Sequence, residues 1–175
     1  YEIPAGSSRA TKGIALINLF PIGEGEKVAD IVATDSVPGS FMLTATLKGE
    51  LKKVAIDSFA SVRSSGLIAH DVEKDDELVG ARLASDKDDV LLVTHRGESI
   101  RFPVSSMRTS LRTSGGVAGI RLIPEDKLVS MDVLTDPEAF MLTVSANGYG
   151  KLTPICDYPR QHRAGRGVRT FKLTD

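Results

Sequence analysis

The chain has 175 residues, which suits one domain or a small repeat array and lets about 70% of the unfolded surface be buried. Apolar residues make up 41% and charged residues 26%, and no apolar run approaches the roughly 20 residues of a membrane-spanning helix, so we expect no membrane partner. The formal net charge of -1, taken over the whole chain, argues against a nucleic-acid-binding protein. The single cysteine, Cys156, excludes an internal disulfide and a multi-cysteine metal site, and it fits a reducing, cytoplasmic compartment. Because the sequence starts at Tyr1 without an apolar leader, we expect a piece excised from a longer chain.

The chain contains an internal repeat. Four segments share a glycine, a branched apolar residue and then alternation: GIALINL (13–19), GLIAHDV (66–72), GVAGIRL (116–122) and GVRTFKL (167–173). A second set keeps the same period of about 50 residues: GELKKVAIDSF (49–59), GESIRFPVSSM (97–107) and GYGKLTPICDY (148–158). Two independent anchors with one period predict repeats over about 13–65, 66–115 and 116–166, with the start of another at 167–175.

Each repeat reads as β-structure. In the second repeat we expect strands at 67–72, 78–84, 89–95 and 99–104, with counterparts in the first and third repeats. Glycine turns are expected to join the last two strands of each repeat: Lys48-Gly49, Arg96-Gly97 and Asn147-Gly148. Asn-Gly is a strong hairpin signal because both residues tolerate positive φ.

The strand pattern predicts an all-β fold with very little helix, because no window shows a sustained period of 3.6. Four antiparallel strands in about 50 residues describe a propeller blade. A closed propeller has four to eight blades, so about three blades and a partial fourth predict an arc of a β-propeller or β-pinwheel spanning residues 1–175.

Basic residues concentrate in the linkers between predicted blades, at 5–13, 57–66, 105–116 and 157–167. Eight basic residues stand there against two acidic ones, so the linkers carry +6 and the rest of the chain -7. Equivalent linkers recur at equivalent places in a repeat fold, so these side chains should line one rim, extended by basic side chains on the last strand of each blade. The candidate DNA-binding residues are Arg9, Lys12, Lys52, Lys53, Arg63, Arg101, Arg108, Arg112, Lys151, Arg160, Arg163, Arg166 and Arg169.

The last linker is the densest of these sites. Arginine occurs at every third position from Arg160 to Arg169, with Gly165 and Gly167 between. Glycine lets the backbone approach a phosphate, and the arginine fork matches phosphate oxygens. The chain lacks tryptophan and has few aromatic residues, so stacking on single strands fits poorly. Side chains spread along a rim favour contacts with the backbone of duplex DNA, which carry little sequence information.

These residues carry a resemblance to a known family. The blocks ATKGIALINLFPI (10–22), LVGARL (78–83), IRFPVSSMR (100–108), GGVAGIRL (115–122), LTVSANGYGKLTPICDYP (142–159) and GRGVRTFKL (165–173) resemble the C-terminal domain of DNA gyrase A. The resemblance implies a β-pinwheel, a propeller variant whose blades exchange strands. It further implies that duplex DNA is bound and wrapped around a basic perimeter, in support of ATP-dependent negative supercoiling by a bacterial type II topoisomerase.

The same resemblance implies that the chain is the middle of that domain and carries no catalytic residue, metal site or cofactor of its own. ATP and Mg²⁺ would belong to other parts of the holoenzyme, and the implied partners are the rest of gyrase A, together with gyrase B, in an A2B2 assembly in the cytoplasm, at the nucleoid. The family's heptad Gln-Arg-Arg-Gly-Gly-Lys-Gly is absent in that form. Its nearest counterpart is QHRAGRG at 161–167, in the context of a later blade.

Three other interpretations stay open. An enzyme would have to use Cys156 with His162 or His70, but a lone cysteine is usually inert and His70 stands in an apolar register. A propeller that serves as a protein-interaction scaffold would need no recurrent basic linkers. The corresponding domain of topoisomerase IV also binds DNA and typically has fewer or irregular blades.

Overall fold

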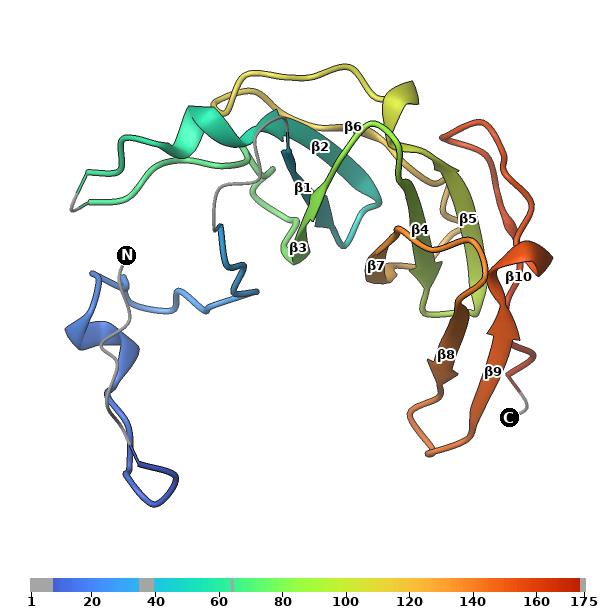
Figure 1. Cartoon of the computed structure of the whole chain (residues 1–175), viewed down its shortest axis with the longest axis horizontal. Coiled ribbons are helices and arrows are strands. Elements are labelled where there is room, and N and C mark those ends of the chain that lie inside the picture. Colours follow the sequence, from blue (N-terminus) through green and yellow to red (C-terminus); the bar gives the residue numbers. More distant parts are fainter. Residues whose placement is uncertain (1–7, 35–39, 64, 174–175) are drawn as a thin grey trace.

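The chain forms an open arc of antiparallel sheets in a computed structural model, which describes residues 8–34, 40–63 and 65–173 (Figure 1). Among these residues there is no α-helix, and the helical turns are short 3₁₀ segments: η1 (Leu16–Asn18), η2 (Ile56–Phe59), η3 (Val104–Ser106) and η4 (Ile155–Asp157). The expected all-β fold with little helix is therefore confirmed.

The first sheet is built around one hairpin. Strands β1 (Phe41–Thr46) and β2 (Glu50–Ala55) form its centre, β3 (Leu78–Ala84) pairs with the free edge of β1, and β6 (Val117–Ala118) pairs with the free edge of β2. All neighbours are antiparallel. The order β3-β1-β2-β6 runs from the inner side of the arc to its convex side (Figure 1).

The second sheet repeats this arrangement. Its hairpin is β4 (Asp89–Thr94) with β5 (Glu98–Pro103), flanked by β7 (Leu128–Leu134) and β10 (Val168–Arg169) in the order β10-β5-β4-β7. A third hairpin, β8 (Phe140–Val144) with β9 (Gly150–Pro154), has no further strand on either edge among the described residues.

Each four-stranded sheet therefore takes strands from three successive repeats. The first sheet joins a hairpin from repeat 13–65 to β3 of the next repeat and β6 of the one after. This is the strand exchange that the family resemblance implied. The chain crosses from one sheet to the next twice per repeat, and this connects neighbouring sheets covalently.

The strand expected at 67–72 is wrong, and so are two counterparts expected in the first repeat: residues 13–19 contain η1 and residues 28–34 form no strand. Residues 67–72 form no strand, whereas their counterparts Val117–Ala118 and Val168–Arg169 do. Each counterpart pairs with the second strand of an earlier hairpin, β2 or β5, which lies about 67 residues upstream in sequence. For residues 67–72 no such hairpin lies in the described part of the chain, so the backbone has no ladder to join.

The hairpin turns differ from the expected type in one respect. Gly49, Gly97 and Gly148 have φ near +80°, but the residue before each of them does not have positive φ. In each turn the glycine N–H bonds to the carbonyl three residues earlier, as in Gly49 to Thr46 at 2.9 Å. This is a type I turn closed by a glycine in the left-handed region, which places the positive φ on one residue.

The core lies between the two complete sheets. Leu43, Ala45 and Leu51 of the first sheet are fully buried with Leu92 and Ile100 of the second, in one continuous apolar cluster. Because the sheets meet face to face, a blade is buried on both faces only when it has a blade on each side.

We predict that the hairpin glycines differ in how well they tolerate alanine. A Cβ on Gly97 would overlap the carbonyl of Phe171, which the exchanged strand brings onto the turn, whereas a Cβ on Gly148 would meet no atom within 4 Å. Gly148→Ala should therefore lose only the left-handed backbone preference, about 1–2 kcal/mol. Gly97→Ala should lose at least about 1 kcal/mol more through overpacking. Urea unfolding at micromolar protein measures both, and equal losses would contradict the close approach.

Candidate nucleic-acid interface

The linkers lie on the convex side of the arc, next to the short outer strands β6 and β10 (Figure 1). We define the convex linker surface as the described residues of 57–66, 105–116 and 157–167. Each linker leaves a hairpin through a 3₁₀ turn (η2, η3 or η4) and ends at a glycine before the next outer segment.

Successive linkers are joined by contacts that repeat with the sequence. Arg112 donates from Nη1 to the carbonyl of Ile68 at 3.1 Å, and Arg163 donates from Nη1 to the carbonyl of Ala118 at 3.1 Å. Ala118 is the counterpart of Ile68 in the next repeat. Backbone bonds reinforce the same junctions, such as Arg121 N–H to the Gly165 carbonyl at 2.8 Å. The linkers thus form one continuous ridge.

A second repeated contact fixes the second and third linkers to the hairpin of the preceding blade. Arg101 on β5 donates from Nη1 to the carbonyls of Ile155 and Tyr158, at 2.8 and 3.2 Å. Lys53, at the same register in β2, donates from Nζ to the counterpart carbonyls of Val104 and Met107, at 3.4 and 3.3 Å. In both cases a basic side chain donates to two carbonyls at one 3₁₀ turn, and the first of the two also accepts a backbone N–H within the turn.

Buried Asp89 strengthens the contact at the last linker. Its Oδ2 accepts hydrogen bonds from Arg101 Nε at 2.7 Å and from Arg160 Nε at 2.8 Å. Arg101 is mostly covered and Arg160 is mostly exposed. One carboxylate therefore holds the beginning of the arginine-rich linker against the sheet.

Lys52 is also an internal residue. Its ammonium contacts the carbonyls of Arg112 and Ser114, beneath the second linker. Burial lowers the pKa of Lys52 from its usual value, nearby Asp71 opposes this, and Arg112 adds to it. The side chain supports the linker from inside.

Three sequence candidates are thus placed inside the protein and not on its surface. Lys52 and Lys53 are almost fully buried, and Arg101 is largely covered by the linker that it holds. Lys53 also pairs with Asp86 and lies 4.0 Å from the centre of the Phe41 ring. Alternation alone could not separate an outward lysine from one whose chain reaches beneath a neighbouring linker.

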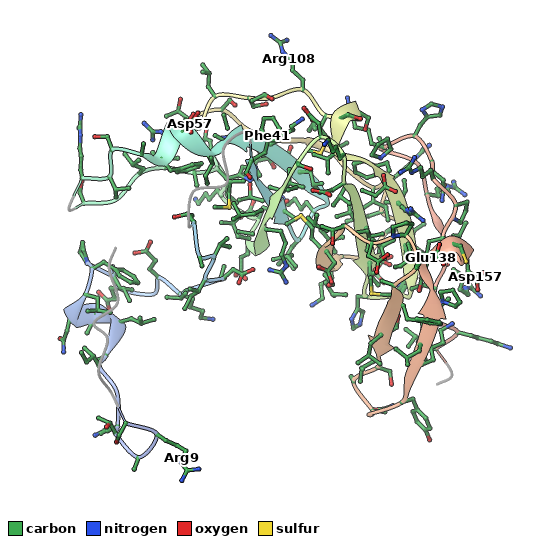
Figure 2. All side chains as sticks on the ribbon, viewed as in Figure 1. Arg9, Phe41, Asp57, Arg108, Glu138 and Asp157 are labelled. Carbon is green, nitrogen blue, oxygen red and sulfur yellow. The ribbon has the colours of Figure 1, made fainter. Side chains whose placement is uncertain are left out.

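Five candidates are exposed and have no side-chain partner among the described residues. They are Arg9, Lys12, Arg63, Arg108 and Arg166. Figure 2 shows Arg108 pointing away from the sheets on the convex side. Arg9 lies at the far end of the N-terminal segment, remote from Arg108 (Figure 2).

The remaining candidates are partly engaged. Arg160 and Arg169 each have one ion pair, with Asp89 and Glu98, and remain mostly exposed. Lys151 is exposed, with its ammonium 5.6 Å from the centre of the Phe171 ring.

The linker boundaries left out two exposed basic residues beside the convex linker surface. They are Arg121 and Lys172, which follow β6 and β10. Each of them lies five residues after the glycine that ends its linker, and this shared position is the sequence signal that could have identified them.

The residues that an enzyme would use, Cys156 with His162 or His70, are not joined by a hydrogen bond in the described part of the chain. Cys156 lies in η4 and is exposed, with its Sγ 3.9 Å from Asp157, and His162 is exposed on the following linker. His70 is buried as expected, with Nδ1 2.9 Å from the Thr44 hydroxyl. Within 8–34, 40–63 and 65–173, no group of three or more His, Cys, Asp or Glu could hold a metal ion, and no helix is long and apolar enough to cross a membrane.

The arrangement of exchanged strands agrees with the comparison to known proteins. The DNA gyrase C-terminal domain family, a β-propeller family, matches residues 1–35, 41–85, 88–135 and 139–175. The chain belongs to this family. It is 46% identical over its whole length to the DNA gyrase A protein of Dehalogenimonas lykanthroporepellens and 36% identical to that of Staphylococcus aureus. It spans about a fifth of the length of these relatives, 22% and 20%.

Solved structures share the fold of this gyrase family member. The C-terminal domain of DNA topoisomerase IV superimposes with a TM-score of 0.81 at 26% identity, over 90% of this chain and 49% of the other. A DNA gyrase A C-terminal domain superimposes with a TM-score of 0.80 at 21% identity, over 90% of this chain and 53% of the other. The second likeness is evidence for the fold alone.

We predict that Asp89→Asn destabilises the protein by about 3 kcal/mol, because it leaves the covered Arg101 without a counter-charge. The matched control is Glu98→Gln, which removes the exposed pair with Arg169 and should cost less than about 1 kcal/mol. Urea unfolding measures both variants. Equal, small losses would show that Asp89 does not hold the linker.

We also predict a pH dependence that His70 controls. Burial first, and Lys52 second, lower the pKa of His70 below 6.5, with Glu50 opposing them. As pH falls from 7.5 to 5.5 the unfolded chain gains a proton before the folded protein does, so stability falls over this range. His70→Ile, which places the residue of the counterpart Ile120 at this site, should reduce the difference in unfolding free energy between pH 7.5 and 5.5. An unchanged difference would contradict the assignment.

Proposed function

We propose that the convex linker surface binds the phosphate backbone of duplex DNA without sequence specificity. The observation that carries the proposal is the recurrence, on consecutive linkers, of exposed arginines without side-chain partners in the described part of the chain: Arg63, Arg108 and Arg166. Long cationic side chains with free donors on the outside of a curved ridge match a curved line of phosphates.

The construction of the ridge supports this proposal. Linker carbonyls are already bonded to Lys52, Lys53 and Arg101 from beneath, so the backbone is fixed before a ligand arrives. Preorganised donors need less ordering on binding, and less of the interaction free energy is lost.

An open depression at the first linker has the groups that a phosphate needs. It is lined by Ser58, Ser61, Arg63, Ser65 and Arg112, together with nearby backbone. Hydroxyls and guanidinium groups are frequent donors to phosphate oxygens. Because Arg112 uses one Nη1 donor on Ile68, its remaining donors are available to the same ligand.

The curvature of the arc is a further argument that the bound DNA is bent. Smooth bending by 40–90° costs on the order of 1–6 kcal/mol over a short site, so no single linker could hold it. Several linkers on one convex side can share this cost.

In the whole protein we propose that this bending supports ATP-dependent negative supercoiling by a gyrase. The rest of gyrase A, together with gyrase B in an A2B2 assembly, would supply the catalytic chemistry, ATP and Mg²⁺. The chain itself would be a non-catalytic DNA-binding part of a cytoplasmic, nucleoid-associated bacterial enzyme. Both curated relatives, from Dehalogenimonas and Staphylococcus, are gyrase A proteins, which favours gyrase over topoisomerase IV.

We predict that Arg63→Gln, Arg108→Gln and Arg166→Gln together weaken duplex binding. If each arginine contacts one phosphate, the slope of log affinity against log salt should fall in magnitude by about 2.7. The matched control replaces by glutamine three exposed lysines outside the linkers that have no ion pair among the described residues: Lys74, Lys87 and Lys127. It changes the net charge equally and should change the slope much less. Fluorescence anisotropy with labelled duplex over a salt series measures both.

Two outcomes would contradict parts of the proposal. Equal slopes for the two triple variants would show that location on the linkers is irrelevant, and no binding at low salt would favour a protein-interaction scaffold. Affinity that does not change with duplex length would contradict wrapping while leaving local binding in place.

A further inference from the structure

The second linker carries a large apolar side chain among its basic ones. Leu111 is 79% exposed, more than any other large apolar side chain among residues 8–34, 40–63 and 65–173. An isolated exposed leucine is ordinary on a protein surface, so its exposure by itself assigns no role. Leu111 differs from an ordinary surface leucine in the backbone that holds it and in the side chains beside it.

The linker of Leu111 lies where both sheets are complete. It leaves β5 of the second sheet through η3 and ends at β6 of the first sheet. The third linker is bonded to both of these sheets too, and its counterpart residue is His162, because Arg163 after it repeats the carbonyl contact of Arg112. His162 is exposed as well. Outward exposure is therefore a property of this position in the linker.

Hydrogen bonds on both sides of Leu111 fix its backbone. The Ser110 N–H donates to the Lys53 carbonyl at 2.8 Å. The Leu111 carbonyl accepts from the Ser114 N–H at 3.1 Å and from the Ser114 hydroxyl at 2.8 Å. The Lys52 ammonium holds the Ser114 carbonyl from beneath. The apolar side chain is therefore presented to solvent from a fixed turn.

Cationic and hydroxyl side chains flank Leu111 along the linker. Arg108, three residues before it, points away from the sheets (Figure 2). Arg112, directly after it, keeps donors beyond the one that it uses on a backbone carbonyl. Thr109 and Thr113 are exposed as well. A purely apolar partner would desolvate these groups without pairing them, which costs free energy. The partner of Leu111 should therefore carry anionic and apolar groups side by side.

The backbone of DNA has this alternation. Its phosphates carry the negative charge, and a deoxyribose with apolar ring carbons separates each phosphate from the next. Arginine side chains bond to phosphate oxygens, and these contacts hold a protein in register along the duplex. An apolar side chain placed between two such arginines then meets a sugar.

We propose that Leu111 packs against a deoxyribose of the bound duplex, between phosphates held by Arg108 and Arg112. This inference rests on the proposed DNA-binding function of the convex linker surface. The contact adds affinity that salt does not screen, because apolar contact releases no counterions. Covering about half of a leucine side chain corresponds to a roughly fivefold gain in affinity.

The first test measures duplex binding of Leu111→Ser and of the unaltered chain over a salt series, by fluorescence anisotropy. Leu111→Ser should lower the affinity about fivefold at every salt concentration, so the two plots of log affinity against log salt should be parallel. Arg108→Gln should instead reduce the magnitude of the slope by about 0.9. Val129→Thr, at an exposed apolar residue of β7 away from the linkers, is the matched control and should leave the affinity unchanged.

Two results of this test would overturn the contact. Coincident plots for Leu111→Ser and the unaltered chain would leave the leucine to a protein partner. Plots of different slope would show that Leu111 acts only through the arginines. Leu111→Met keeps the apolar surface and should bind as the unaltered chain does, and a loss equal to that of Leu111→Ser would overturn the proposal too. Urea unfolding should be the same for all of these variants, because the leucine side chain is largely exposed.

A second test adds the contact where it is absent. His162→Leu places a leucine at the counterpart position of the third linker, where His162 is exposed. At pH 8, where an exposed histidine is neutral, this variant should bind a duplex that reaches both linkers about fivefold more tightly, with the same salt slope. An affinity no higher than that of the unaltered chain would overturn the role of this linker position.

A third test separates a sugar contact from a base contact. Leu111→Ser should lose the same affinity for an AT-rich duplex as for a GC-rich duplex, because the deoxyribose is common to both. A loss confined to one of them would show contact with the base edges and overturn the sugar contact.

Failure of this inference is distinguishable from failure of the proposed function. If the unaltered chain does not bind duplex DNA at low salt, the proposed function fails. If it binds and Leu111→Ser binds equally well, only the leucine contact fails.

Discussion

The structure depends on the pairing of each hairpin with strands from two later repeats. The hairpins β1–β2 and β4–β5 are central pairs, and their edges are covered only because the chain returns about 35 and 67 residues later. In the turns of these two hairpins, the left-handed glycines Gly49 and Gly97 also leave room for the returning chain, which passes directly over them. The core between the sheets, the order of the linkers and their convex position all follow from this exchange.

The strands at 78–84, 89–95 and 99–104, the glycine turns and the all-β repeat could be predicted because alternation and glycine spacing are local signals. The failure at 67–72 has a physical reason that no local signal contains. The same sequence pattern forms a two-residue strand at Val117–Ala118, where the free edge of β2 is available for pairing. It forms no strand at Leu67, because no such edge lies in the described part of the chain. Pairing partners, and not propensity, decide these short edge strands.

The distribution of charge along the chain could be predicted from the sequence, but the contacts that each basic side chain makes could not. The linkers are basic, as the sequence indicates, but the last-strand residues Lys53 and Arg101 turn inward to bond linker carbonyls. Asp89 holds Arg160 and Arg101 together, a role that no sequence pattern indicates. The basic residues therefore have two roles: some build the ridge, and others, such as Arg108, remain free on it. Separating the roles needs the distance from each side chain to a neighbouring linker, which depends on tertiary structure.

Strand exchange also affects how the protein is made. The hairpin ending at Ala55 cannot gain its outer strand before Ala118 has been synthesised. At about 5–20 residues per second, a ribosome needs roughly 3–13 seconds to add the intervening residues. During that interval the edges of the hairpin are open beside a growing chain, and contacts this distant in sequence form slowly. A repeat protein whose blades close late therefore exposes a similar unpaired edge each time a new hairpin emerges.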